Sequence, residues 1–119
     1  EILHTDKAPA AIGRIPAIET GGLIFASGSW FDPGYGALAH SMAAQTVQAL
    51  ENVISVLKAA GLTLNHVVKT TCYLKSMEDF SLFNEIYAQY FRTIAGSLLL
   101  CRGAAPQGRL VEIEVIAAR

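Results

Sequence analysis

Residues 67–91, VVKTTCYLKSMEDFSLFNEIYAQYF, decide the fold of this chain. The first part of this stretch is rich in β-branched residues, which favours a strand over His66–Lys75. Because side chains alternate along a strand, one face is expected to hold Val68, Thr70, Cys72 and Leu74, and the other Val67, Lys69, Thr71 and Tyr73.

The second part of the stretch predicts an amphipathic helix. Ser76 and Asp79 have the Ser-x-x-Asp spacing of a capping box, which marks a helix start. The apolar residues that follow recur at helical spacing and are expected to form the buried stripe: Phe80, Phe83, Ile86, Tyr87, Tyr90 and Phe91.

A longer helix is predicted upstream, over Ala43–Gly61. Ser41 is placed to cap its first turn, and Gly61 is placed to end it in the left-handed conformation. Residues 62–65 form the connection to the strand. The apolar stripe of this helix is expected to comprise Met42, Val47, Leu50, Val53, Ile54 and Leu57.

Two short extended runs lie near the beginning of the chain. Ile15–Thr20 and Leu23–Ala26 flank Gly21-Gly22, a pair typical of a tight hairpin turn. Residues 29–40, which contain Asp32-Pro33-Gly34, are predicted to be a loop. Its aromatic residues suggest a partner surface or a pocket wall, and packing of the loop onto the sheet is an equal alternative.

Two further strands are predicted at the end of the chain, at Leu98–Cys101 and Arg109–Ala118. The expected order is therefore β-β-α-β-α-β-β, an α+β fold with two helices on one face of a mixed sheet. The last strand mixes carboxylates and aliphatic side chains on its second face, which suggests packing against other copies of the chain. The expected face under the helices comprises Val111, Ile113, Val115 and Ala117, and the opposite face Leu110, Glu112, Glu114, Ile116 and Ala118.

Composition and charge exclude several classes of function. The net charge is −1, and the nine Lys and Arg residues are scattered, which argues against a nucleic-acid footprint or a polybasic membrane contact. No apolar run is long enough for a transmembrane helix. Hydrophobic residues make up 52% of the chain, and this excess favours burial between subunits.

Cysteine and histidine positions indicate no metal site. Cys72 and Cys101 lie in apolar runs and are interpreted as buried thiols, which suits a reducing, cytoplasmic compartment. A targeting segment removed before Glu1 stays an open alternative. The three histidines, His4, His40 and His66, lie far apart without ligand spacing.

Taken in order, several segments resemble the Rid family, also called the YjgF or endoribonuclease L-PSP family. The resemblance covers most of the chain and indicates one domain over residues 1–119. The segments are Ala8–Gly13 (APAAIG), Leu23–Gly28 (LIFASG), Asp32-Pro33 with Gly36, Ala43–Gly61, Val67–Phe91 and Val111–Ala117 (VEIEVIA).

The resemblance implies a chorismate-mutase-like fold in which three chains close into a homotrimeric barrel with clefts between subunits. It also implies hydrolysis of reactive enamines and imines, such as 2-aminoacrylate, to 2-keto acids and ammonia. The expected ligand in the cleft is therefore a small imine, enamine or keto acid, and no cofactor or metal is expected.

Four residues match the family's site pattern. Glu114 matches the glutamate thought to hold the attacking water, and is the expected catalytic residue. Gly28, Ser27 and Asn84 match residues that border the cleft, and are the expected substrate-binding residues. Glu112 shares the strand face of Glu114; paired carboxylates can do acid–base work or can be edge charges that prevent wrong strand pairing.

The chain departs from the family pattern at the residue that clamps the substrate carboxylate. Gly96 stands where the family has an arginine, and the tyrosine expected after Ile12-Gly13 is absent. Arg14, Arg92 and Arg102 are the arginines considered as substitutes, and each is equally interpreted as a solvated surface residue.

Without a clamp, efficient 2-aminoacrylate hydrolysis is not expected, because the substrate carboxylate is left unpaired. A non-catalytic or regulatory trimer that binds a small ligand is the first alternative. An endoribonuclease or translation inhibitor, suggested only by older family names, is the second.

Overall fold

The computed structural model describes residues 2–3, 17–27, 41–91, 98–102 and 110–119. Within these ranges the strands are β1 (Ile2–Leu3), β2 (Ala17–Thr20), β3 (Leu23–Ser27), β4 (Val67–Leu74), β5 (Leu98–Arg102) and β6 (Val111–Ala118). The α-helices are α1 (Met42–Ala59) and α2 (Phe80–Phe91), and two short 3-10 helices, η1 (Leu64–His66) and η2 (Met77–Asp79), precede β4 and α2.

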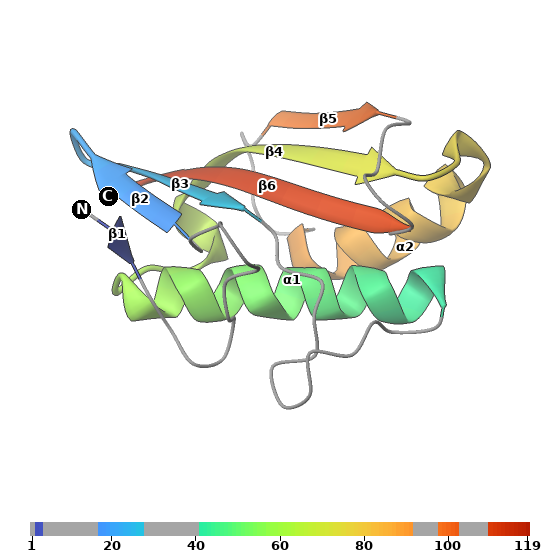
Figure 1. The fold of residues 1–119 in the computed structure, drawn as a ribbon, viewed down its shortest axis with the longest axis horizontal. Coiled ribbons are helices and arrows are strands. Elements are labelled where there is room, and N and C mark those ends of the chain that lie inside the picture. The colour runs from blue at the N-terminus through green and yellow to red at the C-terminus, as the bar shows by residue number, and fades with distance from the viewer. Residues whose placement is uncertain (1, 4–16, 28–40, 92–97, 103–109) are drawn as a thin grey trace.

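The strands form one six-stranded sheet in the order β1-β2-β3-β6-β4-β5 (Figure 1). The β4–β5 pair is parallel and the other pairs are antiparallel, so the sheet is mixed. The predicted order of elements and the α+β class are confirmed, and the two-residue β1 is added at the start.

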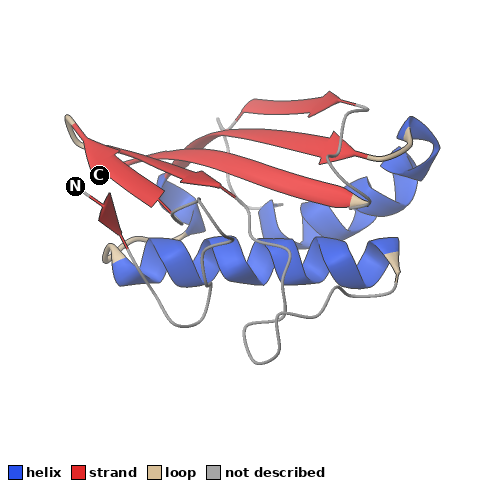
Figure 2. Cartoon of the chain, in the orientation of Figure 1, coloured by secondary structure: helices blue, strands red, loops and turns tan. Residues whose placement is uncertain are grey.

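Both α-helices lie on one face of the sheet, as Figures 1 and 2 show. The core lies between the two layers. The predicted inward face of β6 is confirmed, because Val111, Ile113, Val115 and Ala117 are all buried. The stripe of α2 is also confirmed: Phe83, Tyr87 and Phe91 are buried, and Phe80, Ile86 and Tyr90 are partly buried against the core. The opposite face of the sheet, here called the open face, is covered by neither α1 nor α2.

The predicted turns at Gly21-Gly22 and Gly61 are confirmed. Gly21 and Gly22 have φ angles of 58° and 79°, and they join Thr20 to Leu23 across the β2–β3 hairpin. Such angles strain a residue that carries a Cβ atom. Gly61, at φ 77°, follows the last turn of α1 in the same conformation.

Helix α1 is capped by Ser41 as predicted, and four residues of its predicted stripe, Met42, Leu50, Val53 and Leu57, are buried. The Ser41 hydroxyl accepts a hydrogen bond from Ala44 N at 3.0 Å. The prediction for Val47 was wrong, since its side chain is 40% exposed. Gln45 is buried instead, and its Oε1 accepts a bond from Leu110 N at 2.9 Å, which ties α1 to the start of β6.

Strand β4 contains an irregularity that the sequence pattern did not predict. Its register against β6 shifts between Val67 and Lys69, as in a β-bulge. Val67 is therefore buried and Val68 is 44% exposed, the reverse of the predicted faces. From Lys69 onward the predicted alternation holds. His66, predicted to begin this strand, lies in η1 instead, where its Nδ1 accepts a bond from Thr63 N.

The capping box predicted at Ser76 is only half present. The Ser76 hydroxyl accepts a bond from Glu78 N at 3.2 Å and caps η2, whereas the carboxylate of Asp79 forms no reciprocal bond within the described residues. Helix α2 then begins at Phe80. The local cap therefore starts a 3-10 turn, and the α-helix begins one turn later than the box implies.

Candidate functional site

The predicted catalytic residue lies on the open face, on a strand that is paired with a neighbour on each side. Glu114 of β6 is paired in register with Ser27 of β3 and with Thr71 of β4. The next rung pairs Ile116 with Phe25 on one side and Lys69 on the other. Side chains directly opposite across strands share a face. Residues from three strands therefore converge around Glu114.

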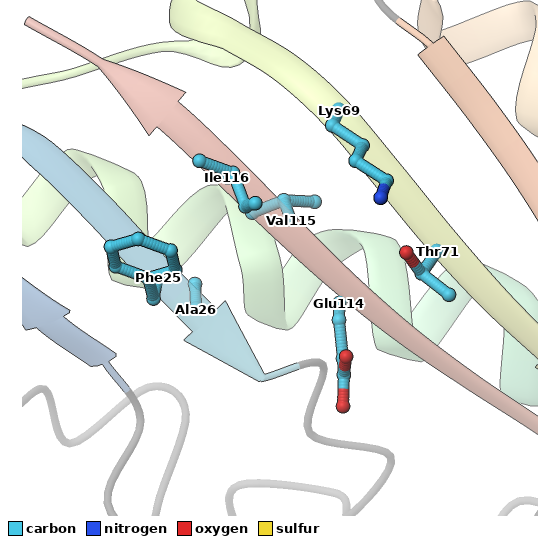
Figure 3. A pocket seen from close by; sticks show the side chains of 7 residues that line it. All are labelled: Phe25, Ala26, Lys69, Thr71, Glu114, Val115 and Ile116. Atoms are coloured by element: carbon cyan, nitrogen blue, oxygen red, sulfur yellow. The ribbon is translucent and has the colours of Figure 1, made fainter.

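A cavity of about 290 Å³ lies over these rungs (Figure 3). Phe25 and Ile116 form an apolar side, and Lys69, Thr71 and Glu114 contribute polar atoms to the lining. Ala26 and Val115 complete its lining. Small-molecule sites commonly combine apolar walls with a few placed polar groups, so this cavity is our candidate site.

Among the described residues, the lining of the cavity includes one cation, Lys69, and one carboxylate, Glu114. The Lys69 side chain extends along β4 toward Thr71, on the side where Glu114 lies (Figure 3). Lys69 is diagonal to Glu114 in the register, since it is paired with Ile116 two residues further along β6. No residue in the described part of the chain forms a hydrogen bond or an ion pair with the Lys69 ammonium.

Glu112 and Glu114 lie in contrasting environments although they share the open face. Glu114 is exposed, whereas Glu112 is buried and is paired in register with Tyr73. A buried carboxylate requires polar partners, because burial without them is costly. Sequence reasoning did not distinguish these environments, and both carboxylates stay candidates for the acid–base role.

The structure places two of the other predicted site residues, Asn84 and the backbone of Ser27. Asn84 is exposed on α2, in the helical layer, and it does not line the cavity. Ser27 ends β3 beside Glu114, and Gly28 lies outside the described residues. Within one chain, the backbone of Ser27 therefore lies next to that of Glu114 across the β3–β6 pair, whereas Asn84 lies in the helical layer.

The arginines considered as clamps remain predictions. Arg14, Arg92 and the Gly96 segment lie outside the described residues. Arg102 is the last residue of β5 and is paired in register with Tyr73. Sequence reasoning missed Lys69 as a cation of the site. The alternation along the strand could have identified it, because Lys69 and Thr71 share one face.

A second cavity, of about 430 Å³, lies between the end of α1 and α2. It is lined by Ile54, Lys58, Leu62, Thr63, Leu64, Asn65 and Tyr90. Burial raises the pKa of the Tyr90 phenol, and the Glu51 carboxylate raises that pKa further. The phenol therefore stays protonated at neutral pH. Since none of the described residues that line it is a carboxylate, this larger cavity is a poorer candidate for water activation.

The described residues offer neither a metal site nor a membrane-spanning helix. No group of three or more His, Cys, Asp or Glu side chains there is arranged to hold a metal ion. Neither α1 nor α2 has the length and apolar character needed to cross a membrane.

The layered architecture and the sheet order define the class of protein: the fold is chorismate-mutase-like. The family model described as endoribonuclease L-PSP matches residues 5–119. The chain therefore belongs to the endoribonuclease L-PSP family, whose members are also called Rid proteins, as the sequence resemblance predicted.

Three relatives illustrate this membership. A 2-iminobutanoate/2-iminopropanoate deaminase of Mus musculus is 41% identical over 123 residues, covering 100% of this chain and 91% of its own. RidA from the Antarctic bacterium Psychrobacter has a TM-score of 0.91 at 34% identity, covering 100% and 99% of the two chains. E. coli TdcF, solved with bound serine, has a TM-score of 0.90 at 30% identity and covers 100% and 98%.

Proposed function

We propose that this protein hydrolyses small 2-imino acids, and their enamine tautomers, to 2-keto acids and ammonia. The observation that carries the proposal is the 41% identity, over the full length of this chain, to a relative named as a 2-iminobutanoate/2-iminopropanoate deaminase. The open-face cavity supports it, because a carboxylate, a hydroxyl and apolar walls meet there.

The reaction requires water to add to the imine carbon. In the proposed mechanism Glu114 accepts a hydrogen bond from that water and receives its proton as the oxygen–carbon bond forms. Glu114 passes that proton to the imine nitrogen, which completes the tetrahedral carbinolamine. It then takes the proton of the carbinolamine hydroxyl and transfers it to the amino nitrogen, so the carbon–nitrogen bond breaks, ammonia leaves and the 2-keto acid remains. Holding water and substrate in one cavity lowers the entropic part of the barrier.

The apolar side of the cavity suits the alkyl end of the substrate. Phe25 and Ile116 are neighbours across β3 and β6, and they lie one rung away from Glu114. A methyl or ethyl group packed against them would direct the imine carbon toward the carboxylate. The volume of about 290 Å³ suits an acid of a few carbon atoms together with one water molecule.

We also propose that the active form is a homotrimer whose open faces meet. Ile18, Phe25 and Val68 lie on or beside this face and are 44%, 43% and 44% exposed. Large exposed apolar side chains grouped on one face are typical of an interaction surface. Assembly would cover this face and bring other segments, such as the surface that carries Asn84, to the edges of the cavity.

The proposed function is tested by turnover. A pyridoxal-phosphate-dependent threonine dehydratase generates 2-iminobutanoate in situ, and semicarbazide competes for the free imine while the release of 2-ketobutyrate is followed. The wild-type protein should restore keto-acid release in the presence of semicarbazide. A rate equal to that with buffer alone would rule out the deaminase activity.

A non-catalytic, ligand-binding role is the second candidate. Gly96 at the position of the family arginine favours it, and so does the relative solved with bound serine. Calorimetric titration with 2-ketobutyrate and with serine tests it. Saturable binding of either ligand without any imine turnover would support this role, whereas turnover would exclude it.

A further inference from the structure

The cavity on the open face contains a cation for which neither the family pattern nor the proposed mechanism provides a role. We infer that Lys69 binds the carboxylate of the substrate, in place of the arginine that this chain lacks. The inference rests on the proposed function, because it assigns a residue to the recognition of the same class of substrate. Three observations carry it.

The first observation is the position of Lys69 relative to Glu114. Residues diagonal to each other across an antiparallel pair lie about 7–8 Å apart, within reach of long side chains. Lys69 and Glu114 stand in this relationship, and both line the cavity. In a 2-imino acid the carboxylate is bonded directly to the imine carbon. The Lys69 ammonium can therefore bind the carboxylate while a water held by Glu114 faces the imine carbon of the same small molecule.

The second observation concerns the state of the Lys69 ammonium. The Lys69 residue is partly buried, and within the described residues its ammonium has no ion pair and no hydrogen bond. A cation that lacks partners among these residues is available to bind an anion from solution. Lys75, by contrast, directly follows β4, is exposed and lies outside the cavity.

The third observation is the chemistry of the surrounding walls. Ile116 lies directly opposite Lys69, and Phe25 lies beyond it on β3, so the cavity that Lys69 lines has an apolar side. Apolar walls exclude water and strengthen the attraction between the ammonium and a carboxylate. The arrangement selects a molecule with an anionic head and a short alkyl tail, which is the chemistry of a three- or four-carbon imino or keto acid.

A lysine differs from an arginine in the selectivity that it confers. An arginine holds a carboxylate through two parallel hydrogen bonds, whereas a lysine acts as a point charge on a flexible stem. We therefore expect a site that requires a negative charge but tolerates variation in the geometry of the acid. A Lys69→Arg variant should retain binding, because it retains the charge.

Calorimetric titration of the purified protein with 2-ketobutyrate and with its neutral amide, 2-oxobutanamide, tests the inference. The wild type should bind the acid at least about tenfold more tightly than the amide, because a charge-assisted bond is lost with the amide. Lys69→Met should weaken binding of the acid by about tenfold or more and leave the amide unaffected. Lys69→Arg should remain close to wild type.

Two control variants complete the design. Lys75→Met makes the same change in net charge at the residue that directly follows β4, and it should leave the affinity for 2-ketobutyrate unchanged. Arg102→Met should also leave it unchanged; if this variant loses the affinity while Lys69→Met keeps it, the inference is overturned. It is equally overturned if the wild type does not bind 2-ketobutyrate, or binds acid and amide alike.

The same variants separate the inference from the proposed function. If the wild type hydrolyses the imine and Lys69→Met has the same KM, the deaminase activity stands and the role of Lys69 fails. If binding of 2-ketobutyrate depends on Lys69 but no imine is hydrolysed, the anion site stands and the deaminase activity fails. A raised KM with kcat little changed in Lys69→Met supports both.

Discussion

The Thr70 and Tyr87 hydroxyl groups lie 2.7 Å apart and form a buried hydrogen bond between β4 and α2. Thr70 is fully buried, and Tyr87 is stacked on Phe91 with ring centroids 4.4 Å apart. The bond therefore fixes the helical layer against the same strand that carries Lys69 and Thr71 on its other face. Within the sheet–helix interface, a polar contact sets the position of α2 along β4.

Tyr87→Phe should destabilise the protein by about 1 kcal/mol, because it removes one buried hydrogen bond and preserves the ring packing. Unfolding in urea measures the change. In a double-mutant cycle, Thr70→Val combined with Tyr87→Phe should cost less than the sum of the two single changes. Strict additivity would show that the two hydroxyls do not interact.

The bulge in β4 predicts opposite roles for two adjacent valines. Val67→Ala should lower the free energy of unfolding by about 2 kcal/mol, because it leaves a void in the core. Val68→Ala should have a much smaller effect on the unfolding of the isolated chain, since Val68 is 44% exposed. Equal losses in the two variants would contradict the register shift.

Glu114→Gln should lower kcat for imine hydrolysis by about 100-fold or more, because the amide cannot take the proton from the attacking water. Glu85→Gln, at an exposed position on α2, is the matched control and should be unchanged. Glu112→Gln decides between the two carboxylates of the strand. A large loss in Glu112→Gln with full activity in Glu114→Gln would transfer the catalytic role to Glu112.

The open face predicts the oligomeric state. Sedimentation of the wild type should give three times the 12.7 kDa mass of one chain. Phe25→Glu should yield smaller species, because it places a charge in the proposed contact. Leu82→Glu is a close control, since Leu82 on α2 is 44% exposed and Phe25 is 43% exposed. A wild type that sediments as a single chain would refute the trimer.

The end of the chain carries a pH-sensitive contact. The guanidinium of Arg119 donates hydrogen bonds to Glu19, one of them from Nη2 to Oε1 at 3.0 Å. These bonds, and to a lesser extent the charge of Arg119, lower the pKa of Glu19. Since the folded pKa lies below the unfolded one, the stabilisation is present above the unfolded pKa and is lost as pH falls through the folded pKa.

An NMR titration of the Glu19 carboxyl carbon measures this effect. Arg119→Ala should raise the pKa of Glu19 toward its usual value, and added salt should do the same because the pair is partly exposed. A Glu19 pKa that is the same in both proteins would show that the contact does not persist in solution. Arg119→Lys, which keeps the charge, should recover only part of the shift.

Much of the fold was predictable because it depends on local chemistry. The alternation of Val111, Ile113, Val115 and Ala117 identified the inward face of β6, and the glycines at 21, 22 and 61 marked turns that require positive φ angles. The stripe of α2 followed from spacing alone. These features need only the periodicity of a strand or a helix and the steric freedom of glycine.

Other features required the neighbouring elements. Whether Val67 or Val68 faces the core depends on the register between β4 and β6, which no local pattern encodes. Gln45 can be buried because its Oε1 accepts a hydrogen bond from Leu110 N, which is far away in sequence. The pattern identified Glu114 as a candidate, but only strand pairing brings Lys69 diagonal to it and Phe25 beside Ile116. A pairing register depends on contacts between distant segments, so packing, not composition, decides which side chains share a cavity.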